Sequence, residues 1–141
     1  MQEAMEKTMA EGVAEKVIVH AKEAGLCLSR SGEFTVVPSL RIPVEEIRGS
    51  EGAGDAFCAG SLYGIYHGIS DRELLEFASA AAACNLFAEN AMDGMKNKEE
   101  IEQVMAAGQG RSYLDLRNDK VAAIRQAAEE KMRLFGCAGK A

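Results

Sequence analysis

The sequence predicts an α/β fold in which short strands and a hairpin precede a helical C-terminal part. Up to about position 48, short runs of β-branched and aromatic residues alternate with turns that contain glycine or proline, a pattern typical of strands. After position 54, apolar residues recur at helical spacing, and several segments begin with residues that cap helices. We therefore expect strands in the first part of the chain and helices in the second.

The first predicted element is an amphipathic helix over residues 1–15, because Met5, Met9 and Val13 recur every four residues among charged side chains. The β-branched run at residues 17–20 then predicts a short buried strand. A helix that leads directly into a strand is consistent with the α/β class.

A β-hairpin is expected next. A loop over residues 21–25 leads into two short strands at residues 26–28 and 34–37, and the polar segment between these strands contains a glycine suited to a hairpin turn. Residues 44–47 suggest one more short strand before the glycines that follow.

The second half of the chain is expected to be helical. Ser70 with Glu73, and Asn97 with Glu100, match the capping box, in which two side chains satisfy each other's free backbone amides. The alanine-rich stretch at residues 74–88 is apolar on nearly every side, so it predicts a buried helix that neighbours approach closely. The predicted helices cover residues 55–68, 71–91, 98–107 and 119–135.

Composition places the chain among ordinary globular proteins. It has 141 residues, of which 48% are hydrophobic and 27% charged, with a formal net charge of −6; one domain with a genuine core is expected. The acidic balance argues against nucleic acid as a partner, because such binding requires neutralisation of phosphates. The sequence has neither a basic leader nor an apolar run of about 18 residues. We therefore expect a cytoplasmic protein that does not bind membranes.

One segment is chemically distinctive: residues 49–57, Gly-Ser-Glu-Gly-Ala-Gly-Asp-Ala-Phe, between a predicted strand and a predicted helix. Small residues at positions 52–54 allow backbone N–H groups to face outward at a helix N-terminus, where free donors and the helix dipole attract an anion such as phosphate. Asp55 would repel phosphate but can accept a proton from an attacking hydroxyl, which fits phosphoryl transfer. The alternative is that Asp55 caps the helix and the glycines only form a tight turn.

Residues 52–60, Gly-Ala-Gly-Asp-Ala-Phe-Cys-Ala-Gly, closely resemble the C-terminal signature of the ribokinase-like (PfkB) carbohydrate kinases. The likeness covers about residues 10–105 and implies the C-terminal half of the ribokinase-like three-layer α/β/α fold. It also implies that the backbone amides of Gly52, Ala53 and Gly54 form an anion hole for the transferred phosphoryl group.

The same resemblance implies that Asp55 is the catalytic base acting on a hydroxyl of a sugar or related polyol. It implies ATP as the phosphoryl donor and Mg²⁺ as the ion that bridges the nucleotide phosphates. Gly25, at the family's glycine turn, and Ser79, where relatives often contact adenine, are the implied nucleotide-binding residues. A serine in an alanine-rich helix is also a common packing residue whose hydroxyl bonds to the backbone.

The chain departs from the family pattern in three places. Residues 49–51 are Gly-Ser-Glu, where the family commonly has Asp-Thr-Thr; because those residues help to build a monovalent-cation site in some members, we expect no strong dependence on potassium. The family's Thr-x-Gly after the strand is replaced by residues 21–25. The N-terminal portion that supplies the sugar contacts, the lid and the Asn-x-x-Glu motif is missing from this sequence.

Residues 1–110 are therefore interpreted as a partial ribokinase-like kinase domain, and residues 111–141 as a helical C-terminal tail. A partial domain exposes an edge and a face of its parallel sheet, which invites pairing with another chain. We expect a homo-oligomer or a complex with a complementing N-terminal kinase half. The alternative function is a truncated, non-catalytic remnant that binds nucleotide or self-associates.

The remaining polar candidates are interpreted as structural. The four cysteines include no Cys-x-x-Cys pair and there are two histidines, so no metal site is predicted. Cys58 is expected to pack against the sheet, and structural roles outweigh catalytic ones for His20 and His67. Asn85 and Asn90, late in a predicted helix, are expected to face solvent or to cap its C-terminal end.

Overall fold

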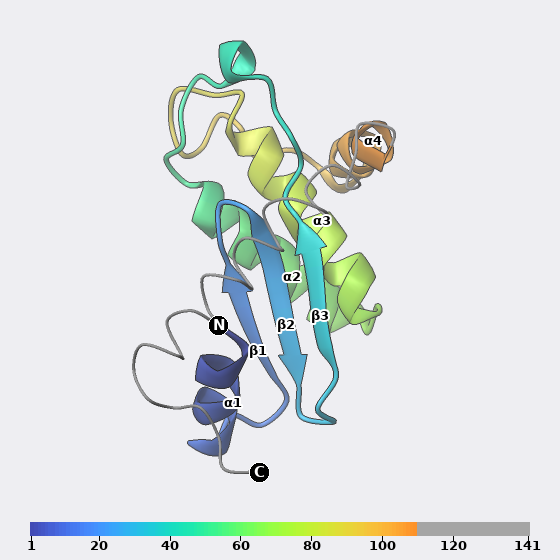
Figure 1. Cartoon of the computed structure of the whole chain (residues 1–141). Coiled ribbons are helices and arrows are strands. Elements are labelled where there is room, and N and C mark those ends of the chain that lie inside the picture. The colour runs from blue at the N-terminus through green and yellow to red at the C-terminus, as the bar shows by residue number, and fades with distance from the viewer. Residues whose placement is uncertain (110–141) are drawn as a thin grey trace, which may run out of the picture.

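The computed structural model describes residues 1–109, which contain a three-stranded sheet with helices packed on one face (Figure 1). The elements in chain order are α1 (Gln2–Ala10), β1 (Lys16–His20), β2 (Ala24–Ser29), β3 (Phe34–Pro38), η1 (Val44–Glu46), α2 (Ala53–His67), α3 (Asp71–Asn85) and α4 (Lys98–Gln109). In Figure 1, α2 and α3 run behind the sheet, and α4 packs against α3.

The sheet has the order β1–β2–β3, and both neighbouring pairs are antiparallel. The hairpin of β2 and β3 is confirmed, with Cys27 opposite Thr35. The loop expected over residues 21–25 is shorter, because His20 pairs with Gly25 and makes β1 and β2 a second hairpin. The expectation of a parallel sheet is wrong for these strands, since connections of a few residues can join only antiparallel neighbours.

The main core lies between the sheet and the helix pair α2 and α3. A second cluster lies between α3 and α4, so α3 is buried from two directions, as its alanine-rich sequence predicted. The main cluster consists of Cys27, Val37, Phe57, Leu74, Leu75, Ala78 and Ala82. The second consists of Phe77, Ala80, Ala81, Cys84 and Ile101.

Small residues allow α2 and α3 to approach closely. A Cβ on Gly60 would lie 2.8 Å from the Cα of Ala78, and a Cβ on Gly64 would lie 2.7 Å from the Cγ of Leu74. Neither distance is compatible with a real side-chain atom, so both positions require glycine at this helix spacing.

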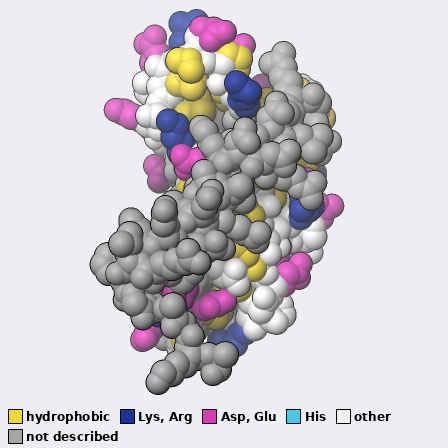
Figure 2. Space-filling view, in the orientation of Figure 1, with side chains coloured by type: hydrophobic (Ala, Val, Ile, Leu, Met, Phe, Trp, Pro, Cys, Tyr) yellow, Lys and Arg dark blue, Asp and Glu magenta, His cyan; other side chains and the backbone are white. Residues whose placement is uncertain are grey.

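Two expectations for the first half of the chain are wrong. α1 ends earlier than expected, at Ala10, and Gly12, with a φ of 111°, lies in the turn that follows. Residues 44–47 form no strand, because Val44–Glu46 make the 3-10 helix η1 and Ile47 follows it as the C-cap residue. Val44 is 82% exposed, and Figure 2 shows apolar side chains on the surface at this end of the molecule. Without burial against a neighbouring strand, the β-branched side chain does not favour an extended backbone.

α3 ends at Asn85, short of the predicted end near residue 91. The carbonyl of the next residue, Leu86, accepts a hydrogen bond from the backbone N–H of Arg48 (2.8 Å). This carbonyl is therefore directed toward a distant segment of the chain and does not continue the helical hydrogen-bond pattern.

Both predicted capping boxes are confirmed. The Ser70 hydroxyl accepts from the backbone N–H of Glu73 (3.3 Å), and the Glu73 carboxylate accepts from the backbone N–H of Ser70 (3.2 Å). Asn97 and Glu100 make the same pair of bonds at 2.9 and 3.1 Å. These bonds begin α3 at Asp71 and α4 at Lys98, where the sequence predicted.

A buried charged cluster ties the start of α3 to the sheet. The Asp71 carboxylate accepts hydrogen bonds from the Lys16 ammonium on β1 and from the Ser29 hydroxyl on β2. Burial opposes ionisation of Asp71, but these two donors outweigh it and hold its pKa below the ordinary value. The hydrogen bond to Asp71 raises the pKa of Lys16. Burial beside the cluster raises the pKa of Cys27 to about 11.

The helix predicted over residues 119–135 and the C-terminal tail at residues 111–141 lie outside the described residues. Within residues 1–109, none of the helices combines the length and the apolar character that crossing a lipid bilayer requires.

Candidate functional site

The glycine-aspartate turn forms the N-terminus of α2. Gly52 is the N-cap residue, and its φ of 77° lies in the left-handed region that favours glycine. No side chain of residues 1–109 caps this helix end, so the interpretation of Asp55 as a helix cap is not supported. Within residues 1–109, no carbonyl accepts from the N–H of Gly52, Gly54 or Asp55, and the N–H of Ala53 makes only a long bond (3.5 Å) to the Ser50 carbonyl.

The turn is open to solvent at Gly54 and Asp55. Both residues are exposed, and no atom of the described part of the chain lies within 4 Å of the position that a Cβ would take on Gly54. The Asp55 carboxylate has no hydrogen bond or ion pair with any other residue of the described part. Free donors, open space and the positive end of a 15-residue helix dipole together suit an anion.

Asn85, at the end of α3, lies directly against this turn. Its side chain is 0% exposed, and its Nδ2 donates a hydrogen bond to the Glu51 carbonyl at 2.5 Å. The expectation that Asn85 faces solvent or caps a helix is wrong, because the segment before α2 packs over it. Asn90 is exposed, as expected, but it lies beyond α3 and does not cap its C-terminal end. Its Oδ1 accepts from the N–H groups of Met92 (3.0 Å) and Asp93 (2.9 Å) in the turn that follows.

The segment before α2 and the segment after α3 pack closely together. A Cβ on Gly49 would lie 2.7 Å from the carbonyl oxygen of Ala88, and a Cβ on Gly52 would lie 2.7 Å from the Cβ of Ala91. Sequence reasoning missed this contact. In the sequence, only the glycines at positions 49 and 52 indicate that another segment comes close, and they do not reveal which segment it is.

Gly25, a predicted nucleotide-binding residue, is buried in β2 beneath Phe57. A Cβ on Gly25 would lie 3.0 Å from the Phe57 Cζ and 3.2 Å from the Leu75 Cδ2. Packing therefore accounts for a glycine here, and the contact with nucleotide stays a prediction. His20 stacks on the same Phe57 ring, which is the structural role expected for it.

Ser79 and Cys58 differ from their expected environments. Ser79 is 4% exposed on α3, and its Oγ has no hydrogen-bond partner among residues 1–109, so the expected bond to the backbone is not formed. Its contact with adenine stays a prediction. Cys58 is exposed, and the expectation that it packs against the sheet is wrong. α2 directs Phe57 and Ser61 into the core, which leaves Cys58 on its outer side.

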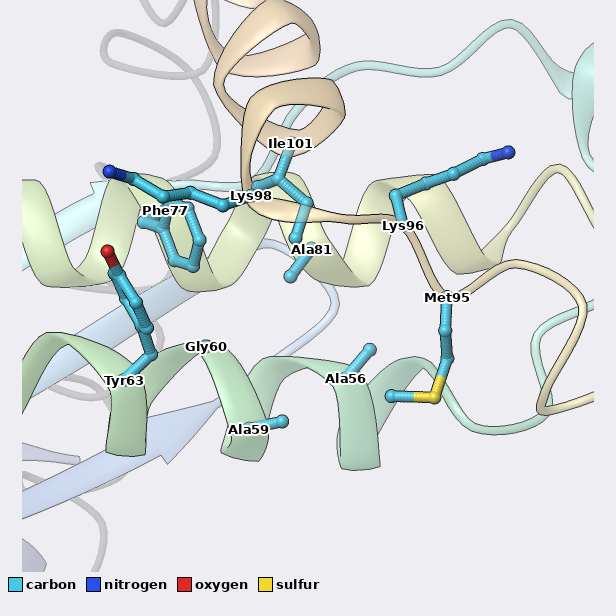
Figure 3. Close-up of a pocket in the computed structure, with 10 residues that line it drawn as sticks. All are labelled: Ala56, Ala59, Gly60, Tyr63, Phe77, Ala81, Met95, Lys96, Lys98 and Ile101. Atoms are coloured by element: carbon cyan, nitrogen blue, oxygen red, sulfur yellow. The ribbon is translucent and has the colours of Figure 1, made fainter.

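A groove of about 210 Å³ lies between α2, α3 and the segment that leads into α4 (Figure 3). Small and apolar side chains form most of its wall, and the ammonium groups of Lys96 and Lys98 lie toward opposite ends of it. No predicted site residue lines this groove. The lining residues are Ala56, Ala59, Gly60, Tyr63, Phe77, Ala81, Met95, Lys96, Lys98 and Ile101.

Comparison with known proteins identifies the family. A family model described as pfkB family carbohydrate kinase matches residues 1–98. The chain belongs to this family. The 5-dehydro-2-deoxygluconokinase of Geobacillus thermodenitrificans is 31% identical to this pfkB-family chain over 87 residues, which are 62% of the chain and 25% of that protein. The chain spans about a quarter of the length of the curated relatives that it matches.

Solved structures agree with this assignment. An Escherichia coli protein described as a ribokinase II, in complex with ATP and Mg²⁺, has a TM-score of 0.64 and 28% identity, and the match covers 75% of the pfkB-family chain and 33% of that protein. The nucleoside kinase of Burkholderia thailandensis, in complex with inosine, has a TM-score of 0.61 and 26% identity. This match covers 69% of the pfkB-family chain and 31% of the nucleoside kinase. The ribokinase-like fold class expected from the sequence is thereby confirmed.

Proposed function

We propose that this pfkB-family chain carries the phosphoryl-transfer site of an ATP-dependent carbohydrate kinase, with Asp55 as the base and Gly52, Ala53 and Gly54 as the anion hole. The observation that best supports this proposal is the N-terminus of α2, where the free N–H groups of Gly52 and Gly54 lie next to the exposed carboxylate of Asp55. Donors for a phosphoryl group and an acceptor for a hydroxyl proton within one helical turn are what the transfer needs.

In the proposed reaction, the Asp55 carboxylate accepts the proton of a sugar hydroxyl while the hydroxyl oxygen bonds to the γ-phosphorus of ATP. The bond from that phosphorus to the β–γ bridging oxygen breaks, and the bridging oxygen keeps the electron pair in ADP. The N–H groups that begin α2 donate to the phosphoryl oxygens during the transfer, and the helix dipole favours their negative charge.

ATP and Mg²⁺ enter the proposal through the fold, because a structural neighbour binds both. The free N–H groups and the open space at Gly54 fit a phosphate group. Within residues 1–109, no three His, Cys, Asp or Glu side chains gather where they could hold a metal ion. We therefore propose that Mg²⁺ is held mainly by the nucleotide phosphates, a common arrangement for this ion. Independence of potassium stays a prediction.

Replacement of the base tests the proposal. The purified chain is assayed for ATP consumption with 5-dehydro-2-deoxygluconate, ribose and inosine, compounds suggested by the names of its relatives and neighbours. Asp55→Asn is expected to reduce turnover by about 100-fold or more, with the melting temperature and ATP affinity unchanged. Glu33→Gln, which neutralises an exposed carboxylate in the β2–β3 hairpin, is the control and keeps wild-type turnover. Full activity of Asp55→Asn would contradict the assignment.

The alternative, a non-catalytic remnant that self-associates or joins a complementing N-terminal kinase half, is favoured by one observation. Leu62 and Tyr66 on α2 are 61% and 86% exposed. Under this alternative, ATP binds without turnover, and deletion of residues 111–141 changes the number of chains per particle, obtained by dividing the light-scattering mass by the mass of one chain. An unchanged number of chains would count against a role for the tail in association.

A further inference from the structure

Asn85 places a buried amide directly against the turn of the proposed site. Burying an amide costs free energy unless hydrogen bonds replace those made with water. The Nδ2 of Asn85 donates to the Glu51 carbonyl at 2.5 Å, and no residue of the described part donates to its Oδ1. Among residues 1–109, the one hydrogen bond of this buried side chain is therefore to the carbonyl that precedes Gly52.

This hydrogen bond orients the peptide group between Glu51 and Gly52. Because a trans peptide is planar, its C=O and its N–H point in opposite directions. Asn85 holds the Glu51 oxygen toward α3, so the N–H of Gly52 is directed away from α3. The side-chain amide thereby determines the direction of a donor at the start of α2.

Two glycines leave space for the amide. A Cβ on Gly52 would lie 2.8 Å from the Asn85 Nδ2, and a Cβ on Gly94 would lie 2.6 Å from the Asn85 Oδ1. A side chain at either position would displace the amide. The turn and the segment after α3 therefore confine Asn85 to one position.

We infer that Asn85 is a positioning residue that orients the Glu51–Gly52 peptide and, through it, the N–H donors that begin α2. Its significance for catalysis rests on the proposed function. A second hydrogen bond joins the same two segments, because the Leu86 carbonyl accepts from the N–H of Arg48 (2.8 Å). Loss of the Asn85 amide is therefore expected to change the turn without detaching it from α3.

The first test uses amide NMR spectra of the full chain without ligand, for Asn85→Ala, Asn85→Asp and the control Cys84→Ala. Cys84 is 2% exposed and packs between α3 and α4, so its loss removes buried atoms from the same helical turn. We expect both Asn85 variants to shift the N–H resonances of Gly52 and Gly54, and the control to leave them in place. Unchanged Gly52 and Gly54 resonances in both Asn85 variants would overturn the inference.

A titration with Mg·ATP provides the second test. Both Asn85 variants are expected to weaken the ATP affinity by about tenfold, the effect of one misdirected hydrogen bond to a charged group, while Cys84→Ala keeps the wild-type affinity. Wild-type affinity in both Asn85 variants would overturn the inference. If the wild-type chain itself binds no ATP, the proposed function fails, and the ligand-free spectra still decide the role of Asn85.

Discussion

The imidazole ring of His20 stacks on the phenyl ring of Phe57, with centroids 4.1 Å apart and planes 6° from parallel. His20 ends β1, and Phe57 lies two residues after Asp55 in α2, so this contact joins the sheet to the helix that carries the proposed site. Burial lowers the pKa of His20. Gly25 on the neighbouring strand leaves space for the same phenyl ring. The first turn of α2 is therefore held in place by the packing of Phe57.

Gly25→Ala is expected to lower the free energy of unfolding by about 1–3 kcal/mol, because the new methyl group would press on the Phe57 ring. Phe57→Leu in the double variant restores part of this loss, since leucine leaves more space. Urea unfolding of the two single variants and the double variant measures the coupling. Strictly additive losses would contradict the contact. A titration of Gly25→Ala with Mg·ATP tests the predicted nucleotide contact separately.

Gly52→Ala is expected to cost more stability than Gly32→Ala. Both positions have a positive φ (77° and 89°), which costs alanine about 1–2 kcal/mol. Only at Gly52 would the Cβ also collide with other atoms, whereas nothing in residues 1–109 lies within 4 Å of a Cβ on Gly32. Overpacking adds about 1–3 kcal/mol at Gly52. Thermal unfolding of the two variants measures which one loses more stability. An equal loss of stability in both would contradict the prediction and would show that the turn moves to accept the methyl group.

Lys16→Met is expected to cost about 3 kcal/mol of stability at neutral pH, because it leaves the buried Asp71 carboxylate without its charged partner. Unfolding by urea at pH 7 measures this loss. Glu3→Gln breaks the exposed ion pair between Glu3 and Lys7 and serves as the control with little effect. A Lys16→Met variant as stable as wild type would contradict a stabilising role for the cluster.

The same cluster predicts a dependence of stability on pH. The pKa of Asp71 is lower in the folded chain than in the unfolded chain, so the folded state favours the ionised carboxylate. Its contribution is present above the unfolded pKa, about pH 4, and is lost as the pH falls through the lower folded pKa. Urea unfolding between pH 5 and pH 2 measures how the free energy of unfolding falls with pH, and this fall should be smaller in Asp71→Asn than in the wild type. The same fall in both proteins would contradict the lowered pKa of Asp71.

Cys58 is expected to react with a thiol reagent far faster than the buried Cys27 and Cys84. For Cys27, the raised pKa of about 11 alone lowers the thiolate fraction at pH 8 by about a hundredfold relative to an ordinary thiol. The measurement uses a Cys137→Ser background.

Cys58 lies three residues after Asp55 on the same side of α2. Mg·ATP should therefore slow its modification, and an unprotected Cys58 would argue against nucleotide at this turn.

Features that depend on near neighbours in the chain could be predicted from the sequence. The capping boxes of Ser70 and Asn97 and the hairpin of β2 and β3 were correct, because their hydrogen bonds join residues close in sequence. The burial of α3 followed from its alanine-rich sequence, which is apolar on nearly every side. The turn at residues 52–55 was placed correctly at a helix N-terminus, because glycine conformation and helix starts are local properties.

The surroundings of that turn could not be predicted in this way. Asn85 was expected near solvent, and it became a buried donor to Glu51 only because a segment more than thirty residues earlier packs over it. Likewise, the outward position of Cys58 depends on which side of α2 faces the core. Neither the hydrogen bond from Asn85 to Glu51 nor the exposure of Cys58 was evident from the residues next to it in the sequence.

The sequence by itself determined the strand-to-helix order, the helix starts and the position of the glycine-aspartate turn at a helix N-terminus, because these arise from interactions within a few residues. Only the tertiary structure decided where α3 ends, why residues 44–47 form no strand, and which side chain orients the turn. Each of these outcomes depends on whether a segment distant in the chain supplies a hydrogen bond or a covering surface. Arg48 supplies a hydrogen bond to the Leu86 carbonyl, whereas Val44 stays 82% exposed. Local propensity is too weak to override such contacts once the core has formed.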